Sequence, residues 1–278
     1  MRRLTALALL ALLAAAPAQA LEKPLGAVSH IHGLAVDPLD PDGLYLATHH
    51  GLWLAAPSGT ARLVSNHQDD LMGFSPHPTE PSTFFASGHP AGGGNLGLIV
   101  SRDSGATWQQ VSPGLDGPAD FHQLDIADAA PQVLYGVWRG LQVSRDGGTS
   151  WQRVGPAPEG LIDLAVAGGA ERLLAATETG LLESPDGGRS WRPADLRRNP
   201  ATMVEGLADG TAYAWFHGVG LVRQRPGERG WTQLGALPGG GYLLHFAVAP
   251  GRFYGVDGQG RILVSRDEGK SWLPYGSK

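Results

Sequence analysis

Ser265-Arg266-Asp267-Glu268-Gly269-Lys270-Ser271-Trp272 is the stretch that decides the fold, because its pattern recurs along the chain. The pattern is Ser-x-Asp-x-Gly-x-Ser/Thr-Trp, and its other intact copies are Ser101–Trp108, Ser144–Trp151 and Ser184–Trp191. A degraded copy, Arg223–Trp231, also ends on a tryptophan. The five tryptophans lie 43, 40, 40 and 41 residues apart: Trp108, Trp151, Trp191, Trp231 and Trp272. A nearly constant period of this size indicates a repeat architecture.

Each residue type in the motif suits a tight turn between two strands. The aspartate carboxylate can accept backbone N–H groups of the turn that follows it. The glycine supplies a positive φ that other residues resist, and the Ser/Thr hydroxyl can close a further local hydrogen bond. The tryptophan then begins the next strand with a large apolar body. The motif therefore predicts a structural turn, held by Asp103, Asp146, Asp186 and Asp267.

The first twenty residues have the pattern of a secretory signal peptide. Met1-Arg2-Arg3 is positively charged, an apolar run follows from Leu4 to Ala16, and Pro17-Ala18-Gln19-Ala20 provides an Ala-x-Ala site. The apolar run is too short for a comfortable membrane span. We therefore expect cleavage after Ala20, a periplasmic or secreted protein, and no transmembrane segment.

The composition excludes several classes of function. The chain has no cysteine, which excludes disulfides, thiolate metal sites, cysteine nucleophiles and lipoprotein anchoring. Its formal charge is −5, and removal of Arg2 and Arg3 makes it −7, with no basic cluster that would favour nucleic acid as a partner. With 41 Gly and 21 Pro and no convincing amphipathic helix, the chain is expected to be all-β.

Six repeat units share one internal order: an apolar strand, a turn, two apolar strands around a short turn, then the motif and a last strand. The units are His30–Val64, Asp70–Val111, Phe121–Val154, Leu161–Ala194, Ala201–Leu234 and Tyr242–Tyr275. Four strands per unit predict a six-bladed β-propeller, a single domain over residues 21–278. Seven blades are the alternative, but a seventh would need about forty more residues. We expect Leu21–Ser29 to add a strand that helps to close the ring.

The motif resembles the Asp-box (BNR repeat) of the sialidase-like superfamily of β-propellers, and the resemblance covers units two to six. Four segments also resemble an exported bacterial branch generally labelled glycosyl-hydrolase-like: His30–Pro38, Ala47–Trp53, Met72–Pro78 and Ala86–Pro90. The resemblance implies a propeller with its boxes on the blade periphery. The three arginines and the Tyr/Glu pair of sialidases are not visible in this chain. The repeat is also similar to that of photosystem-assembly propellers, which are protein-binding platforms.

Histidines are concentrated in the first three units, where eight of the ten lie between His30 and His122. Alignment of the first strands on their apolar cores puts one residue per unit at an equivalent position: His32, Met72, His122, Ile162, Glu205 and Leu244. Because the first strand of a propeller blade lines the central channel, we expect these side chains to point towards one axis.

The turn between the second and third strands lies at the same end of the propeller as the start of the first strand, and the motif turns lie at the opposite end. This turn carries His49 and His50 in unit one, His89 in unit two, Arg139 in unit three and His217 in unit five. The same end is expected to collect His30, Asp69, Asp70 and Asp120. His77 falls in the other turn and His245 is one position out of phase, so neither is assigned to the site.

This histidine cluster predicts a transition-metal site. Neutral imidazole suits copper, zinc, iron and nickel, and a thioether adds a preference for Cu(I). Copper is the favoured ion and zinc the alternative, with no organic cofactor, and the candidate ligands are His32, Met72, His122, His49, His50 and His89. A polar pocket without metal, to which His30, Arg139 and His217 would contribute, and a purely structural role are the alternatives.

Two further hypotheses belong to other classes of function. Glycoside hydrolysis usually needs two carboxyl groups, about 5–5.5 Å apart for retention or about 6.5–9.5 Å for inversion. The candidates for these groups are Asp70, Asp120 and Glu205. A platform that binds a glycan or a periplasmic protein without catalysis would use aromatic residues near the same face: Trp53, Trp138, Trp215 and Phe216.

Overall fold

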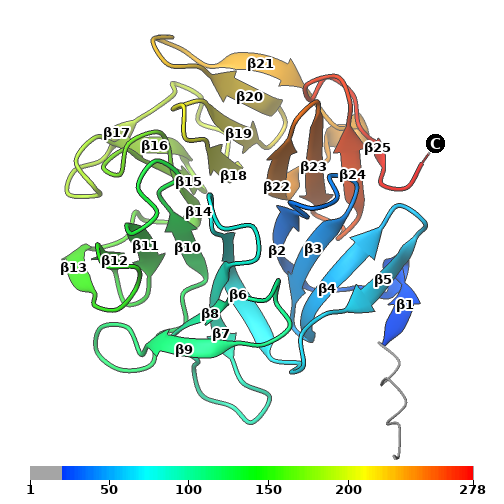
Figure 1. Ribbon diagram of the computed structural model, residues 1–278. Helices are drawn as coiled ribbons and strands as arrows, with labels where there is room; N and C mark the ends of the chain where they lie inside the picture. Colours follow the sequence, from blue (N-terminus) through cyan, green and yellow to red (C-terminus); the bar gives the residue numbers. More distant parts are fainter. Residues whose placement is uncertain (1–20, 278) are drawn as a thin grey trace, which may run out of the picture.

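Six antiparallel sheets form a ring around a central channel, and the chain passes through them in sequence order (Figure 1). The computed structural model describes residues 21–277, so the predicted signal peptide lies outside the described residues. The predicted all-β, six-bladed propeller is confirmed. The only helices described are two short 3-10 turns, η1 (Leu25–Ala27) and η2 (Pro238–Gly240). None of the helical segments in residues 21–277 has the length and apolar character that a membrane crossing requires.

Each blade has four strands that follow one another outward from the channel. Blade one contains β2 (Ile31–Val36), β3 (Leu44–Thr48), β4 (Gly51–Ala56) and β5 (Thr60–Leu63). Blade two contains β6 (Asp70–Pro76), β7 (Phe84–His89), β8 (Leu98–Ser101) and β9 (Gln109–Ser112). Blade three contains β10 (Gln123–Ile126), β11 (Leu134–Val137), β12 (Leu141–Ser144) and β13 (Gln152–Gly155).

The second half of the chain repeats this arrangement. Blade four contains β14 (Leu161–Val166), β15 (Leu173–Thr177), β16 (Gly180–Ser184) and β17 (Arg192–Pro193). Blade five contains β18 (Ala201–Gly206), β19 (Ala212–Phe216), β20 (Gly220–Gln224) and β21 (Thr232–Gly235). Blade six contains β22 (Leu243–Ala249), β23 (Arg252–Asp257), β24 (Ile262–Ser265) and β25 (Leu273–Pro274).

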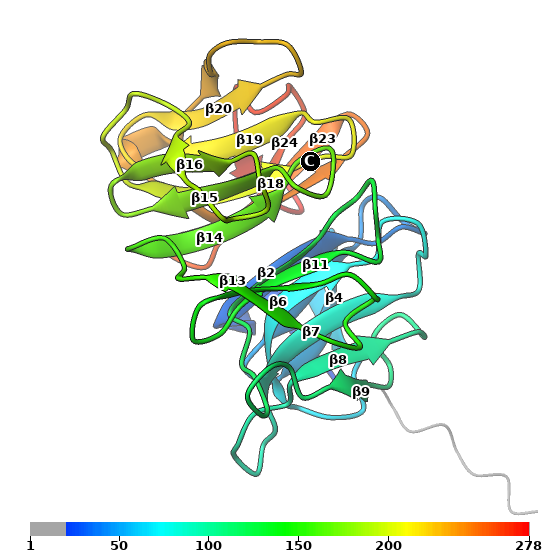
Figure 2. The same ribbon diagram turned by 90° about the vertical axis from the view of Figure 1, so that its left-hand side faces the viewer.

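The first strand of every blade lines the central channel, as the repeat alignment predicts. A cavity of about 1270 Å³ is lined by residues of all six first strands. In the view turned by 90°, β2, β6 and β14 lie towards the middle of the molecule, and β8, β9 and β20 lie towards its outside (Figure 2). The channel is therefore the place where side chains from different blades can meet.

The hydrophobic core is divided into six clusters, one at each junction between neighbouring blades. The second strands are covered on both faces, which explains why they read as continuous apolar runs. All five residues of β3, β15 and β19 are buried. Burial at about 25 cal/mol per Å² of apolar surface makes these junctions the main source of stability.

The four intact motifs form the same turn between the third and fourth strands of their blades. Asp186 accepts the hydroxyl of Ser190 (2.6 Å) and its backbone N–H (2.9 Å), while Ser184 Oγ accepts the N–H of Gly188 (2.7 Å). These hydrogen bonds, the Ser190 hydroxyl first, lower the pKa of Asp186 to about 2. Equivalent bonds surround Asp103, Asp146 and Asp267.

The glycine of each motif allows neighbouring blades to approach closely. Gly148 has φ 86°, and a Cβ there would lie 2.0 Å from Cδ2 of Leu98 in the preceding blade. Three other motif glycines face a leucine in the same way: Gly105 with Leu52, Gly188 with Leu141 and Gly269 with Leu221. The motif therefore joins blades as well as closing a turn.

The ring closes by packing between blades one and six. The predicted extra strand forms as β1 (Glu22–Pro24), but it pairs with β5 on the outer edge of blade one. An edge strand is where Pro24 is tolerated, because proline has no N–H to donate. Within residues 21–277, blades one and six exchange no strand. Instead, His245 Nε2 donates to the Ile31 carbonyl (3.0 Å) and the Tyr254 hydroxyl to the Pro41 carbonyl (2.7 Å).

Candidate functional site

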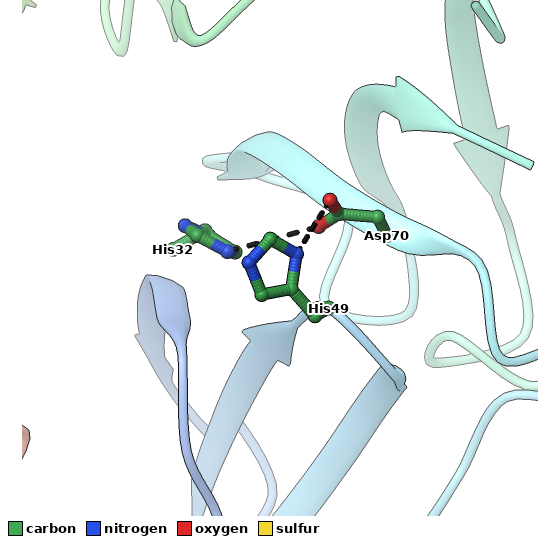
Figure 3. Close-up of side chains that lie close together, drawn as sticks. All are labelled: His32, His49 and Asp70. Atoms are coloured by element: carbon green, nitrogen blue, oxygen red, sulfur yellow. Dashed lines mark hydrogen bonds and ion pairs between the residues drawn. The ribbon is translucent and has the colours of Figure 1, made fainter. Parts of the chain in front are cut away.

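The first of two histidine–aspartate clusters, called site one, lies at the junction of blades one and two (Figure 3). It consists of His32 on β2, His49 directly after β3 and Asp70 at the start of β6. His49 Nδ1 lies 2.6 Å from Asp70 Oδ2, and His32 Nε2 lies 3.7 Å from Asp70 Oδ1. His32 Nε2 and Asp70 Oδ1 are buried atoms with no hydrogen-bond partner among the described residues.

The second cluster, called site two, lies at the junction of blades two and three. It consists of His89 at the end of β7 and of Asp120 and His122 just before β10. His89 Nε2 and His122 Nε2 lie 3.1 and 2.7 Å from the same oxygen, Asp120 Oδ2. The Asp120 side chain is only 6% exposed, and its Oδ1 has no hydrogen-bond partner within residues 21–277.

The glycine-rich insert of blade two orients one histidine of site two. His89 Nδ1 lies 2.8 Å from the Gly94 carbonyl, which can only accept a hydrogen bond. Nδ1 therefore carries the proton, and in the neutral ring Nε2 keeps its lone pair. Histidines that ligate metals are commonly fixed in this way by a carbonyl on the other nitrogen.

The two sites are built from the same repeat positions. His49 and His89 each come at the end of a second strand, and each pairs with an aspartate at the start of the next blade, Asp70 and Asp120. The third ligand differs, because site one takes His32 from its first blade and site two takes His122 from its second.

Blade two has Met72 at the position equivalent to His32 and His122. Met72 is buried, and it belongs neither to the two clusters nor to the residues that line the cavity. β6 is irregular between Met72 and Ser75, and burial of the thioether satisfies an apolar side chain. Met72 therefore does not line the cavity, although the alignment predicted that its thioether would point towards the channel.

The titration behaviour of the histidines differs between the sites. Burial lowers the pKa of His32, although the charge of Asp70 opposes the shift. The hydrogen bond to Asp120 raises the pKa of His122, and burial opposes that shift. The lowered pKa of His32 favours its neutral imidazole, which is the form that binds a metal ion.

The remaining predicted residues lie around the clusters or away from them. His30 is exposed, with its ring 4.8 Å from that of His49, and the His50 ring is 6.5 Å from His49. Arg139 lies over the Trp138 ring in an exposed turn of blade three, and His217 contacts Tyr242 in blade five. Arg139, His50 and His217 are in neither cluster.

Glu205 lies with a different group of carboxylates from Asp70 and Asp120. It lines the channel with Asp125, Asp128 and Asp163. Burial raises the pKa of Glu205 well above its usual value, and the charge of Asp125 adds to this. The candidate catalytic residues are therefore divided between the two histidine sites and this group of four carboxylates, called the acidic wall.

Two carboxylates of the acidic wall fasten blades together. Asp125 Oδ2 accepts the N–H of Val166 (2.7 Å), and Asp163 Oδ2 accepts the N–H of Val204 (2.9 Å). Burial raises the pKa of Asp125 to about 8 and that of Asp163 to about 7. The sequence analysis did not identify these residues, although a lone acid within each apolar first strand is a visible signal.

His245 also lines the channel, although the sequence alignment left it out as one position out of phase. β22 is irregular between Leu243 and His245, which changes the phase of the strand. Burial lowers the pKa of His245 to about 4, and its N–H is used by the Ile31 carbonyl. Its position indicates a structural role. His77 lies in the other turn, where its ring accepts the N–H of Glu80 (3.1 Å).

Three of the aromatic residues proposed for a binding platform belong to the core. Trp53 is 2% exposed, and Trp215 and Phe216 are fully buried. Large rings fill the space between blades, so these three cannot stack on a sugar, and that prediction is wrong. Trp138 is partly buried against the cluster between blades two and three.

The fold and the sites together define a six-bladed β-propeller with two His₂Asp clusters on adjoining blade junctions. No protein-family model matches the chain, and no curated protein does. The chain is similar to a GH74 xyloglucanase from Xanthomonas campestris, with a TM-score of 0.60 and 19% identity over 92% of this chain and 46% of that one. It thus spans less than half the length of that enzyme.

Two other solved structures are of more comparable length. YCF48 bound to D1 peptide has a TM-score of 0.56 and 15% identity, over 91% of this chain and 84% of that one. A protein of unknown function from Bacteroides thetaiotaomicron has a TM-score of 0.63 and 9% identity, over 87% and 71%. Identities this low support the propeller fold alone, so the sialidase-like relationship stays a prediction from the motif.

Proposed function

We propose that this protein is an exported β-propeller that binds divalent transition-metal ions, one at site one and one at site two. The observation that carries the proposal is the convergence of unpaired, buried donor atoms: His32 Nε2, Asp70 Oδ1 and Asp120 Oδ1. A buried polar atom without a partner costs about 1–3 kcal/mol. A cation at site one would satisfy His32 Nε2 and Asp70 Oδ1, and a second cation at site two would satisfy Asp120 Oδ1.

The donor set favours zinc as the ion. Each site offers two imidazoles and one carboxylate, whose ligand atoms lie within 4.8 Å of one another. Zn²⁺ sites with three protein ligands of this kind are common, and Cu²⁺, Fe²⁺ and Ni²⁺ also accept imidazole. The expectation of copper depended on the Met72 thioether. Without that ligand the preference for Cu(I) disappears, and copper stays as the alternative in its divalent form.

A titration of the metal-free protein tests this function. Residues 21–278, stripped with a chelator, would be titrated with Zn²⁺ and Cu²⁺ by calorimetry. We expect about two ions per chain, about one in the His49→Ala and Asp120→Ala variants, and about two in the control His77→Ala, which alters a partly exposed histidine in the turn after β6, at the other end of that strand from Asp70. A stoichiometry near zero for every ion, or unchanged binding after both site substitutions, would refute the proposal.

A second candidate is a peptide-binding platform. It is favoured by the similarity to YCF48 bound to D1 peptide, which covers most of both chains. A pulldown from periplasmic extract with the metal-loaded protein tests it, and absence of a specific partner would count against it. Glycoside hydrolysis by Asp70 and Asp120 has only the fold similarity to the xyloglucanase in its favour.

A further inference from the structure

The two sites differ in the donors that surround them. In site one the β2–β3 register pairs Ile31 with Thr48. His30 comes directly before β2 and His49 directly after β3, so the two residues lie opposite each other. The His30 ring lies 4.8 Å from that of His49, and the His49 ring lies 4.4 Å from that of His32. Beside the two imidazoles and one carboxylate of site one, His30 therefore offers a third imidazole next to His49.

The backbone of His30 is held in an uncommon conformation. Its φ of 54° lies in the left-handed region, which non-glycine residues rarely adopt and which tends to occur at functional positions. His30 is exposed, so its ring is free to turn towards an ion bound by its neighbours. This residue can supply a fourth ligand to site one.

Site two has no equivalent of His30. The β6–β7 register pairs Asp70 with His89, so the position that His30 occupies in blade one is occupied by Asp70 in blade two. Both oxygens of Asp70 already face site one, Oδ2 towards His49 and Oδ1 towards His32. Site two is therefore left with three donors.

The histidines of site two are more exposed than those of site one, although Asp120 (6%) is less exposed than Asp70 (18%). The side chains of His89 and His122 are 39% and 52% exposed, compared with 23% for His32 and 37% for His49. A divalent ion held by two neutral imidazoles and one carboxylate keeps a net charge of +1, so its free position attracts an anion. Metal sites that keep an open position are the ones that bind water or substrate.

We infer that an ion at site one is closed by four protein ligands, whereas an ion at site two keeps a free position that binds a small anion. This inference rests on the proposed metal binding. Site one then has a structural role at the junction of blades one and two, and site two is the position at which an external ligand is exchanged.

Cobalt substitution separates the two sites. Four-coordinate Co²⁺ absorbs visible light strongly, and higher-coordinate Co²⁺ absorbs weakly. The metal-free chain of residues 21–278 would be loaded with Co²⁺ and titrated with azide, an anion that fills open positions. The Asp120→Ala variant isolates site one and the His49→Ala variant isolates site two. We expect a strong, azide-insensitive spectrum from site one and an azide-dependent spectrum from site two.

His30→Ala tests the fourth ligand, and His50→Ala, a neighbouring exposed histidine, is the matched control. We expect His30→Ala to weaken Co²⁺ binding at site one at least tenfold and to make that site sensitive to azide, with no change in His50→Ala. Equal azide responses of the two isolated sites, or identical behaviour of the two variants, would overturn the inference while leaving metal binding intact. Absence of any Co²⁺ binding would overturn both.

Discussion

The channel has two polar walls, formed largely by different blades, and the polar atoms of the two walls differ in their hydrogen-bond partners. The histidine wall, sites one and two, is formed by blades one to three, with His32 and His122 lining the channel itself, and the acidic wall by Asp125, Asp128, Asp163 and Glu205 of blades three to five. In the acidic wall, Asp125 and Asp163 accept backbone N–H groups of the next blade. In the histidine wall, buried donor atoms are left without partners.

The comparison separates a structural use of polar residues from a ligand-binding use. A buried carboxylate that receives a backbone N–H fastens two strands and needs nothing more. A buried carboxylate oxygen that faces only imidazoles and receives no hydrogen bond can be stabilised by a bound cation. The hydrogen-bond partners of Asp125 and Asp163, compared with the unpaired oxygens of Asp70 and Asp120, distinguish the two walls.

The largest expected difference between the walls is how substitutions in them change the stabilisation of the fold by a bound metal ion. At about 100 times the dissociation constant, Zn²⁺ should raise the free energy of unfolding by about 2.7 kcal/mol per occupied site. We expect the Asp70→Ala, Asp120→Ala double variant to lose this metal-dependent increment and Asp128→Asn, in the acidic wall, to keep it. Urea unfolding with and without Zn²⁺ measures both. An equal loss in Asp128→Asn would mean that the acidic wall binds the ion.

A somewhat smaller effect tests whether the blades differ only at the channel or also at their motif turns. Gly148→Ala should cost about 2–3 kcal/mol, because φ is 86° and the added Cβ would lie 2.0 Å from Leu98. Gly147→Ala, with φ 69° and nothing within 4 Å, should cost only about 1 kcal/mol. Gly188→Ala, against Leu141, should match Gly148→Ala. Thermal and urea unfolding measure the loss of stability in each variant. Unequal losses in Gly148→Ala and Gly188→Ala would show that the blades also differ at the motif turns.

The smallest effect is the pH dependence that the acidic wall contributes. Because burial raises the pKa of Asp125 to about 8 and of Asp163 to about 7, the folded state binds more protons than the unfolded state between about pH 4 and pH 8. The contribution of these groups to the free energy of unfolding is therefore complete below pH 4 and is lost as the pH rises to about 8.

The Asp125→Asn, Asp163→Asn double variant should remove this loss, which is about 1.4 kcal/mol per pH unit for each carboxyl while it is protonated in the folded state and ionised in the unfolded state. Asparagine can still accept the N–H groups of Val166 and Val204, so folding should be retained. Urea unfolding at pH 5 and pH 8 compares the two proteins. If the free energy of unfolding changes between pH 5 and pH 8 by the same amount in the double variant, these carboxylates are ionised in the folded protein.

Most of the fold could be predicted from the sequence because its signals are local and repeated. The spacing of the five tryptophans gave the repeat length, the shared order of apolar strands gave six units, and the motif residues make their hydrogen bonds within one turn. Placement of β1 could not be predicted in the same way. A three-residue strand that contains Pro24 has no pattern that selects an outer edge over the gap between blades one and six.

The site was predicted in part. His32, His49, His89, His122, Asp70 and Asp120 were all identified as candidates, because the repeat alignment assigns them to one end of the ring. The alignment failed at Met72, which does not line the cavity, and at His245, which does. The first strands of blades one, two, four, five and six all pair irregularly with their second strands, so spacing from the apolar core does not fix which residues face the channel. An irregularity of one residue reverses the phase of a strand and leaves no mark in composition or spacing.

By itself, the sequence determined that this protein is a ring of six blades, because each blade repeats the same turn chemistry and the same apolar strands. It also determined which residue types are available at the channel. Only the tertiary structure decided which of them meet, since His49 and Asp70 belong to different blades, as do His89 and Asp120. A pair of this kind depends on the angle and register between blades, which packing at the junction sets and no local pattern contains.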